Sequence, residues 1–251
     1  MRTLWIVILV VSIIGNVVGG YLLYKVYKLR AEIQIIKGYL DNMTARYTEL
    51  KNDFAGTSEY RAANADLLHA TTPEQRREMT VLFGASITRR WDLEKYFPGK
   101  RLINRGVGAQ SNTQLLTRFS ADVLRLEPGR VVIKFCSGNF NPDADFEQMW
   151  DEYETMAVMA GEREIKPMLA TIIPVTRGAE TYEGYAITEN VVKFNDRIRK
   201  LATEKNLPVV DYFKAMADSE DFLPDSLARD TIHPNENGYA IMAGVLKPLL
   251  P

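Results

Sequence analysis

The 251-residue chain has little of what metal and redox chemistry require. It contains one cysteine, Cys136, and two histidines, His69 and His233. A single cysteine cannot form an internal disulfide, and one thiol with two separated histidines does not make a structural zinc site. We therefore predict no metal and no cofactor. Cys136 lies inside an apolar run, so it is expected to be a small buried hydrophobic residue.

An excess of one charge is also missing. The chain has 31 Lys and Arg residues against 32 Asp and Glu residues, and the basic residues are scattered. Nucleic-acid-binding domains instead carry a clustered basic face, so no nucleic-acid partner is predicted. There is no glycine-rich phosphate loop ending in Gly-Lys and no His-Glu-x-x-His pair. These absences argue against nucleotide hydrolysis and zinc proteolysis.

Charged residues are absent from residues 4–24 as well. As a helix, a run of this length crosses roughly 30 Å of hydrocarbon. A cleaved signal peptide is the alternative, but the apolar region is long and no small-x-small cleavage site follows it. We expect residues 1–25 to be an uncleaved single-pass membrane anchor, with residues 4–24 against lipid. The basic residues that follow favour a cytoplasmic carboxyl-terminal domain by a small margin.

An unbroken apolar rhythm follows this run, in alternating steps of three and four residues. The residues are Ile33, Ile36, Leu40, Met43, Tyr47, Leu50 and Phe54. This spacing is the seam of a coiled coil, and it extends backwards to Leu22. It predicts a coiled-coil stalk over residues 26–56 and a homo-oligomer formed through residues 22–54. The alternative is an amphipathic helix packed on its own globular domain.

Strand-like and helix-like segments alternate in the remaining chain, after a polar stretch, residues 57–79, that we expect to be a linker. The apolar strand-like runs are Val81 to Phe83, Leu102 to Val107, Val131 to Cys136, Met168 to Val175 and Pro208 to Phe213. Helical spacing between them is clearest over residues 112–126, and a final helix is expected over about 236–249. This alternation predicts an α/β domain over residues 80–251, with a mostly parallel five-stranded sheet covered by helices on both faces.

Polar residues follow several of these strands, and parallel strands bring such loops to one edge of the sheet. Ser86 follows the first strand in Gly84-Ala85-Ser86, and His233 is the natural base for its hydroxyl. Asp230, three residues before His233, can accept the imidazole Nδ1–H. The backbone N–H groups of Ser86 and Ala109 and the side-chain amide of Asn139 could form an oxyanion hole.

Each of these residues also has a purely structural interpretation. Asp230 and His233 could cap the final helix, with Pro234 in its first turn. Asn139 could be a turn former. Gly106-x-Gly108 after a strand is typical of a dinucleotide-binding loop, but Ser111 stands where the third glycine belongs.

Four motifs in this order resemble the SGNH/GDSL hydrolases, a superfamily of serine esterases and acylhydrolases with a flavodoxin-like, three-layer fold. They are Gly84-Ala85-Ser86-Ile87-Thr88, Asn104-Arg105-Gly106-Val107-Gly108-Ala109, Ser137-Gly138-Asn139, and Asp230-x-x-His233-Pro234-Asn235 with Gly238-Tyr239. The resemblance is strongest to bacterial acylhydrolases of the platelet-activating-factor-acetylhydrolase type. It implies a catalytic triad of Ser86, His233 and Asp230, and an oxyanion hole of Ser86, Ala109 and Asn139.

Three positions depart from the pattern of that superfamily. Ala85 replaces an aspartate, Ala109 replaces the oxyanion glycine, and Phe140 replaces a second acid, which suggests an apolar wall. Ala109 would be strained if its position needs a positive φ. The resemblance implies a membrane-anchored esterase that cleaves small acyl esters, such as O-acetyl glycans or lipid esters. Such substrates favour an extracytoplasmic domain, so the membrane side stays open. The alternative is a weakly active or inactive scaffold or binding protein of the same fold that assembles as an oligomer at the membrane.

Overall fold

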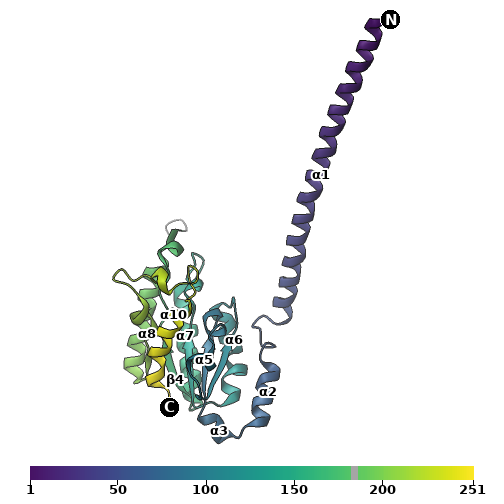
Figure 1. Ribbon diagram of the computed structural model, residues 1–251. Coiled ribbons are helices and arrows are strands. Elements are labelled where there is room, and N and C mark those ends of the chain that lie inside the picture. The colour runs from purple at the N-terminus through teal and green to yellow at the C-terminus, as the bar shows by residue number, and fades with distance from the viewer. Residues whose placement is uncertain (182–185) are drawn as a thin grey trace. The chain divides into compact units, whose positions relative to one another are not determined.

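The computed structural model describes residues 1–181 and 186–251 (Figure 1). The chain divides into two compact units, Met1–Asn52 and Asp53–Pro251. The first unit is one unbroken helix, α1 (Arg2–Asn52), which joins the predicted anchor and the predicted stalk without a break. The helix ends before residue 56, where the stalk was predicted to end, because Asp53 begins a turn that belongs to the second unit. By length and composition α1 could cross a membrane, a test that signal sequences also pass. Its large apolar side chains are exposed along its length, so the lipid contact and the coiled coil remain predictions.

The segment 57–79 belongs to the second unit rather than forming a linker. It contains two helices, α2 (Arg61–Ala70) and α3 (Pro73–Arg77). The side chain of Thr72 caps α3 in a capping box with Gln75, as the sequence Thr-Pro-Glu-Gln indicates. Polar bonds attach the segment to the domain: the Tyr60 hydroxyl donates to the Gly106 carbonyl oxygen at 2.6 Å, and Asn64 Nδ2 donates to Asp122 at 2.8 Å. Hydrophobic periodicity does not report attachment of this kind.

The second unit is built on a parallel sheet of five strands, which confirms the predicted fold class. The strands are β1 (Thr80–Gly84), β2 (Leu102–Gly106), β3 (Arg130–Lys134), β4 (Lys166–Ala170) and β5 (Val209–Val210). Their order is β2-β1-β3-β4-β5, with every neighbouring pair parallel. This is the flavodoxin-like order. Strands β4 and β5 are shorter than the apolar runs that predicted them, because the first run continues into a buried loop after Ala170 and the second continues into a helix that begins at Tyr212.

Side chains that alternate along each strand build a core on each face of the sheet. Val81 and Phe83 of β1 face one core, and Leu82 between them faces the other. The helices that contribute to the first core are α6 (Asn112–Asp122), α7 (Phe146–Glu162) and α8 (Ile187–Lys205). Those that contribute to the second are α4 (Ser86–Arg89), α9 (Tyr212–Met216) and α10 (Glu236–Leu246). The result is the predicted three-layer sandwich.

The strand order fixes where a ligand can bind. From β1 the chain continues to β2 on one side of β1, and then crosses to β3 on its other side. Loops that leave β1 and β3 therefore diverge and leave a crevice at the carboxyl edge of the sheet. Ser86 follows β1, and Asn139 ends a short 3-10 helix, Ser137–Asn139, that follows β3. Both predicted site residues thus lie at this switch point.

Candidate active site

Ser86 is the first residue of α4, directly after a sharp turn at Ala85 (φ −96°, ψ −142°). Its Oγ lies 2.8 Å from His233 Nε2, although the two residues are 147 positions apart in the sequence. The N–H groups of a first helical turn have no acceptor inside the helix, so Ser86 presents both its hydroxyl and its backbone N–H at the start of α4. This is the placement that a nucleophile with its own oxyanion donor requires.

Asp230 holds the other side of the imidazole. Both of its carboxylate oxygens lie 2.9 Å from His233 Nδ1, and Oδ1 also accepts the backbone N–H groups of Ile232 and His233. Partial burial raises the pKa of Asp230, but the hydrogen bonds from Ile232 and His233 outweigh it and leave that pKa below its usual value. Asp230 therefore stays ionised and orients the ring with Nε2 toward Ser86.

The helix cap that Asp230 and His233 could have provided comes from another residue. Asn235 Oδ1 accepts the backbone N–H groups of Asn237 and Gly238, which makes Asn235 the cap of α10. Pro234 therefore lies before the helix rather than in its first turn. Tyr239 of α10 donates from its hydroxyl to the Ile87 carbonyl oxygen at 2.8 Å, which joins this helix to the nucleophile turn.

A pocket of about 710 Å³ surrounds the serine and the histidine, and the three candidate oxyanion donors line it. Ala109 lies in the left-handed region, with φ 57°, so the position does use the conformation that glycine adopts without strain. Asn139 lies in the same wall, but its Nδ2 donates to the Gln110 carbonyl oxygen at 3.1 Å and to Asn112 Oδ1 at 2.8 Å. Both amide hydrogens of Asn139 are thus engaged in the structure.

Phe140 is a core residue rather than the predicted apolar wall of the pocket. It is buried and packs edge to face against Phe194, with ring centroids 5.3 Å apart. An apolar residue directly after Asn139 is explained by the short 3-10 helix Ser137–Asn139, which turns the next side chain away from the crevice and into the core.

Asn104 and Gly106 support the nucleophile turn from the neighbouring strand. Asn104 Nδ2 donates to the Thr88 carbonyl oxygen at 2.7 Å, and its Oδ1 accepts the Gly106 backbone N–H at 2.9 Å. A Cβ on Gly106 would lie 2.1 Å from the backbone nitrogen of Arg89, so only glycine lets α4 pack this closely against β2. These contacts explain the asparagine and the glycine of the second motif.

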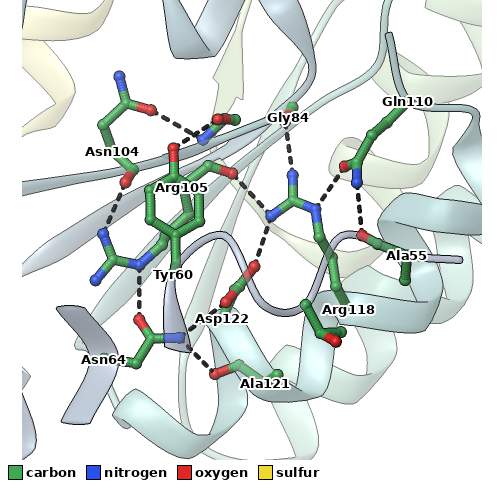
Figure 2. A network of polar contacts seen from close by, with 12 residues as sticks. Ala55, Tyr60, Asn64, Gly84, Asn104, Arg105, Gln110, Arg118, Ala121 and Asp122 are labelled. Atoms are coloured by element: carbon green, nitrogen blue, oxygen red, sulfur yellow. Dashed lines mark hydrogen bonds and ion pairs between the residues drawn. The ribbon is translucent and has the colours of Figure 1, made fainter. Parts of the chain in front are cut away.

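Sequence reasoning missed a buried polar network beneath the site, which Figure 2 shows. Arg118 is completely buried and forms an ion pair with Asp122 at 2.8 Å. Its Nη2 donates to the Gly84 carbonyl oxygen and its Nη1 to the Arg105 carbonyl oxygen. One signal could have revealed the pair: Arg118 and Asp122 are four residues apart on the same helical face as Leu115, a face otherwise buried.

Within residues 1–181 and 186–251, no three His, Cys, Asp or Glu side chains lie together in an arrangement that could hold a metal ion. What the site does contain is a serine, a histidine and an aspartate in hydrogen-bonded sequence, beside backbone donors. That arrangement can activate a hydroxyl for attack on an acyl group.

Comparison with known proteins agrees with this geometry. A model of the GDSL-like lipase/acylhydrolase family matches residues 82–241, which is more than half of the chain. No curated protein matches. A GDSL-like lipase from Bacteroides thetaiotaomicron is 26% identical, with a TM-score of 0.70, over 78% of this chain and 98% of that one.

Two further solved structures have the same fold. A Bacteroides fragilis protein described as an acylhydrolase is 28% identical, with a TM-score of 0.70, over 78% of this chain and 96% of that one. A catalytic mutant of an acetylxylan esterase from Geobacillus stearothermophilus is 19% identical, with a TM-score of 0.55, over 68% of this chain and 93% of that one. With the match of the family model over residues 82–241, the chain belongs to the GDSL-like lipase/acylhydrolase family.

Proposed function

We propose that the protein is a membrane-anchored serine esterase that cleaves small acyl esters by a Ser-His-Asp mechanism. The observation that supports it most directly is the 2.8 Å contact between Ser86 Oγ and His233 Nε2, with Asp230 on the other ring nitrogen. The family match over residues 82–241 supports hydrolysis of acyl esters.

In this mechanism Ser86 Oγ attacks the ester carbonyl carbon while His233 Nε2 takes the hydroxyl proton. The tetrahedral intermediate collapses, the proton passes from His233 to the leaving alcohol, and an acyl-enzyme on Ser86 remains. Water then repeats the sequence: His233 takes its proton, the hydroxide adds to the acyl carbon, and the acid leaves as Ser86 regains its proton. Asp230 remains ionised throughout and stabilises the imidazolium.

The oxyanion of each intermediate would accept the backbone N–H groups of Ser86 and Ala109. Asn139 can join them only by giving up one of its two present bonds, to Gln110 or to Asn112. Ala109 carries a Cβ where glycine would leave space, which favours a small acyl group. An acetyl ester is therefore the natural first substrate, whether carried by a glycan or by a lipid, and one solved protein of the same fold is an acetylxylan esterase.

We further propose that residues 4–24 of α1 lie in the membrane and that residues 22–54 form the interface of a homo-oligomer. The exposed apolar side chains of α1 support both assignments. An inactive scaffold is not favoured, because nothing in the hydrogen-bonded chain from Asp230 to Ser86 is disrupted.

The test is hydrolysis of p-nitrophenyl acetate by the full-length protein in detergent, compared with Ser86→Ala. We expect wild-type turnover and a loss of at least about 10³-fold in the variant, together with fluorophosphonate labelling of Ser86 alone. Equal rates for the two proteins, or no labelling of the wild type, would overturn the proposal.

A further inference from the structure

Gln110 follows Ala109 directly, and both polar atoms of its side chain and its backbone oxygen have partners. Its side-chain Oε1 accepts Arg118 Nε at 2.6 Å, and its Nε2 donates to the Ala55 carbonyl oxygen at 2.6 Å. Its backbone oxygen accepts Asn139 Nδ2 at 3.1 Å. The side chain is 5% exposed. Gln110 therefore belongs to the candidate oxyanion loop and contacts the candidate oxyanion asparagine, Asn139. Figure 2 shows its bonds to Arg118 and to Ala55, in the segment that precedes α2.

Arg118, a partner of Gln110, is itself fixed by hydrogen bonds and an ion pair. Arg118 joins the carbonyl oxygens at the carboxyl ends of β1 and β2, at Gly84 and Arg105, by bonds of 2.8 and 2.9 Å. Asp122 neutralises it, and Asn64 of α2 donates to Asp122 at 2.8 Å. A buried charge with every contact satisfied is rigid, because each lost contact is costly in a low dielectric.

The Ala55 carbonyl is fixed by a tight turn. Asp53 accepts the backbone N–H groups of Thr57 and Ser58 at 2.8 and 2.7 Å, and Gly56 has φ +64°. A Cβ on Gly56 would lie 3.1 Å from Gln110 Nε2, so the glycine lets this turn approach the amide closely. Residues 53–64 thus reach the candidate active site through Gln110.

We propose that Gln110 is a positioning residue that keeps Ala109 in its left-handed conformation and Asn139 in the pocket wall. The segment Asp53–Asn64 is, on this view, part of the catalytic unit. This inference rests on the esterase activity proposed above. Its physical basis is that oxyanion donors act only when they are preorganised, so a loosened loop lowers kcat more than it raises KM.

A matched control lies one helical turn further on. Gln114 is also buried, and its Nε2 donates to the Phe54 carbonyl oxygen at 2.6 Å, a bond of the same length to the same segment. Gln114 does not line the pocket around Ser86. Both substitutions remove a bond of 2.6 Å to the segment that precedes α2, and Gln114→Met also removes the capping-box bond from the Ser111 backbone N–H to Gln114 Oε1 at 2.9 Å. Only Gln110→Met removes the bond from Arg118 to a residue that lines the pocket.

The experiment measures kcat, KM and Tm of full-length Gln110→Met and Gln114→Met, with active sites counted by fluorophosphonate. We expect both variants to lose several degrees of Tm, Gln110→Met to lose about 10-fold or more in kcat with KM within about threefold, and Gln114→Met to keep kcat within about twofold. Equal kcat per active site in the two variants would overturn the inference.

A second variant covers the case in which Gln110→Met does not fold. Gln110→Glu still accepts from Arg118, but it places a carboxylate oxygen, which cannot donate, against the Ala55 carbonyl oxygen, so it breaks the attachment to the amino-terminal segment and keeps the bond to Arg118. A kcat loss in Gln110→Glu supports the inference, and wild-type kcat overturns it. Absence of turnover in the wild type would instead count against the proposed function.

Charged residues that line the same pocket lead to an independent inference about the charge of the substrate. Arg89 and Arg90 line it beside Ser86 and His233, and no Asp or Glu is among its lining residues. Arg89 is paired with Glu59 at 3.0 Å. Arg90 is exposed and makes no side-chain hydrogen bond or ion pair with any residue of 1–181 or 186–251. A guanidinium without a partner is suited to a carboxylate or phosphate oxygen.

We infer that Arg90 forms an anion subsite and that the preferred esters carry a carboxylate or a phosphate near the scissile bond. Two acetyl esters test this, 4-acetoxybenzoate and its uncharged methyl ester, with 4-acetoxyphenyl phosphate as a third probe. We expect Arg90→Gln to lower the ratio of kcat/KM for anionic over neutral ester about 5- to 10-fold, and less in high salt.

The control for this measurement is Arg163→Gln, at an exposed position next to the amino edge of the sheet, which should leave the ratio unchanged. The carboxylate and phosphate probes show which anion the subsite selects. An unchanged ratio in Arg90→Gln for both probes overturns the inference, while turnover of the neutral ester alone would leave the esterase proposal standing.

Discussion

The two units of this chain use apolar residues in opposite ways. Along α1 the large apolar side chains are exposed, Leu9 by 61% and Leu40 by 55%, whereas Phe119 and Phe194 in the second unit are fully buried. The second unit thus buries most of its large apolar side chains within its own fold. The helix α1 has no such cover within its own unit, and an apolar surface of that size is stable only against a lipid or another protein.

This difference indicates separate roles for the two units: we assign the chemistry to the second unit and the location at the membrane to α1. The candidate catalytic groups, their supporting network and both cores lie within residues 53–251. Changes in that unit should therefore affect chemistry and unfolding, and changes in α1 should affect only membrane association and assembly.

Replacement of Asp230 by Asn should have the largest effect on the rate of ester hydrolysis. All of the proposed catalytic residues lie in the second unit, so this change tests that unit alone. The amide keeps the shape of the side chain but favours the wrong imidazole tautomer, so we expect kcat to fall about 10³- to 10⁴-fold. The fall in kcat is measured with p-nitrophenyl acetate as the substrate. Removing residues 1–52 should change the same rate less than about twofold, and a comparable loss in that truncation would contradict the separation.

Truncation of a single apolar side chain compares the two units directly. Phe119→Ala removes a buried ring that packs edge to face on Phe83 at 5.1 Å, so it should cost about 3–5 kcal/mol of unfolding free energy. Leu40→Ala, on the exposed seam of α1, should leave unfolding of the second unit unchanged. Denaturant titration of the two variants gives both values. A loss of more than about 1 kcal/mol in Leu40→Ala would show that α1 supports the second unit.

The sequence predicted the sheet because its strands are short apolar runs between turn residues. It predicted Ser86, Asp230 and His233 because parallel strands bring separate loops to one edge, and the structure places all three within hydrogen-bonding distance in the predicted order. The catalytic roles of these residues are still proposals, which the kinetic experiments address.

What the sequence could not predict depends on polar contacts between distant segments. Residues 57–79 were expected to be a linker because few of them are apolar, yet Tyr60 and Asn64 attach them to β2 and α6. Gln110 and Arg118 carry no motif, and only the structure reveals their partners. The two bonds that engage the Asn139 amide are equally invisible in a linear pattern.

A buried lysine extends the comparison to charge, since Lys25 and Lys28 on α1 are exposed. Lys134 at the end of β3 is buried, and burial lowers its pKa from 10.5 to about 8. The unfolded chain therefore binds more protons between about pH 8 and 10.5, and stability attributable to this group rises with pH across that window. Lys134→Met should add roughly 1–3 kcal/mol at pH 7 and progressively less above pH 8.

The free energy of unfolding, measured for Lys134→Met and for the wild type at pH 7 and at pH 9.5, checks this prediction. Lys28→Met on α1 is the control, and it should show no gain at either pH. A gain for Lys134→Met that is the same at both values would mean that packing, not the buried charge, explains it.

The smallest predicted effect concerns Ala109, whose φ of 57° places a Cβ where glycine is unstrained. Ala109→Gly should raise stability by about 0.5–1 kcal/mol, because relief of the left-handed conformation exceeds the added freedom of the unfolded chain. Glu164 has the same φ of 57° but lies between α7 and β4, at the opposite edge of the sheet. Glu164→Gly should therefore give a similar change in Tm without any change in kinetics. Ala109→Gly should in addition widen the pocket and raise the relative rate on butyrate over acetate esters. If both variants leave that ratio unchanged, Ala109 does not border the acyl group, and the small-acyl preference inferred from its Cβ is wrong.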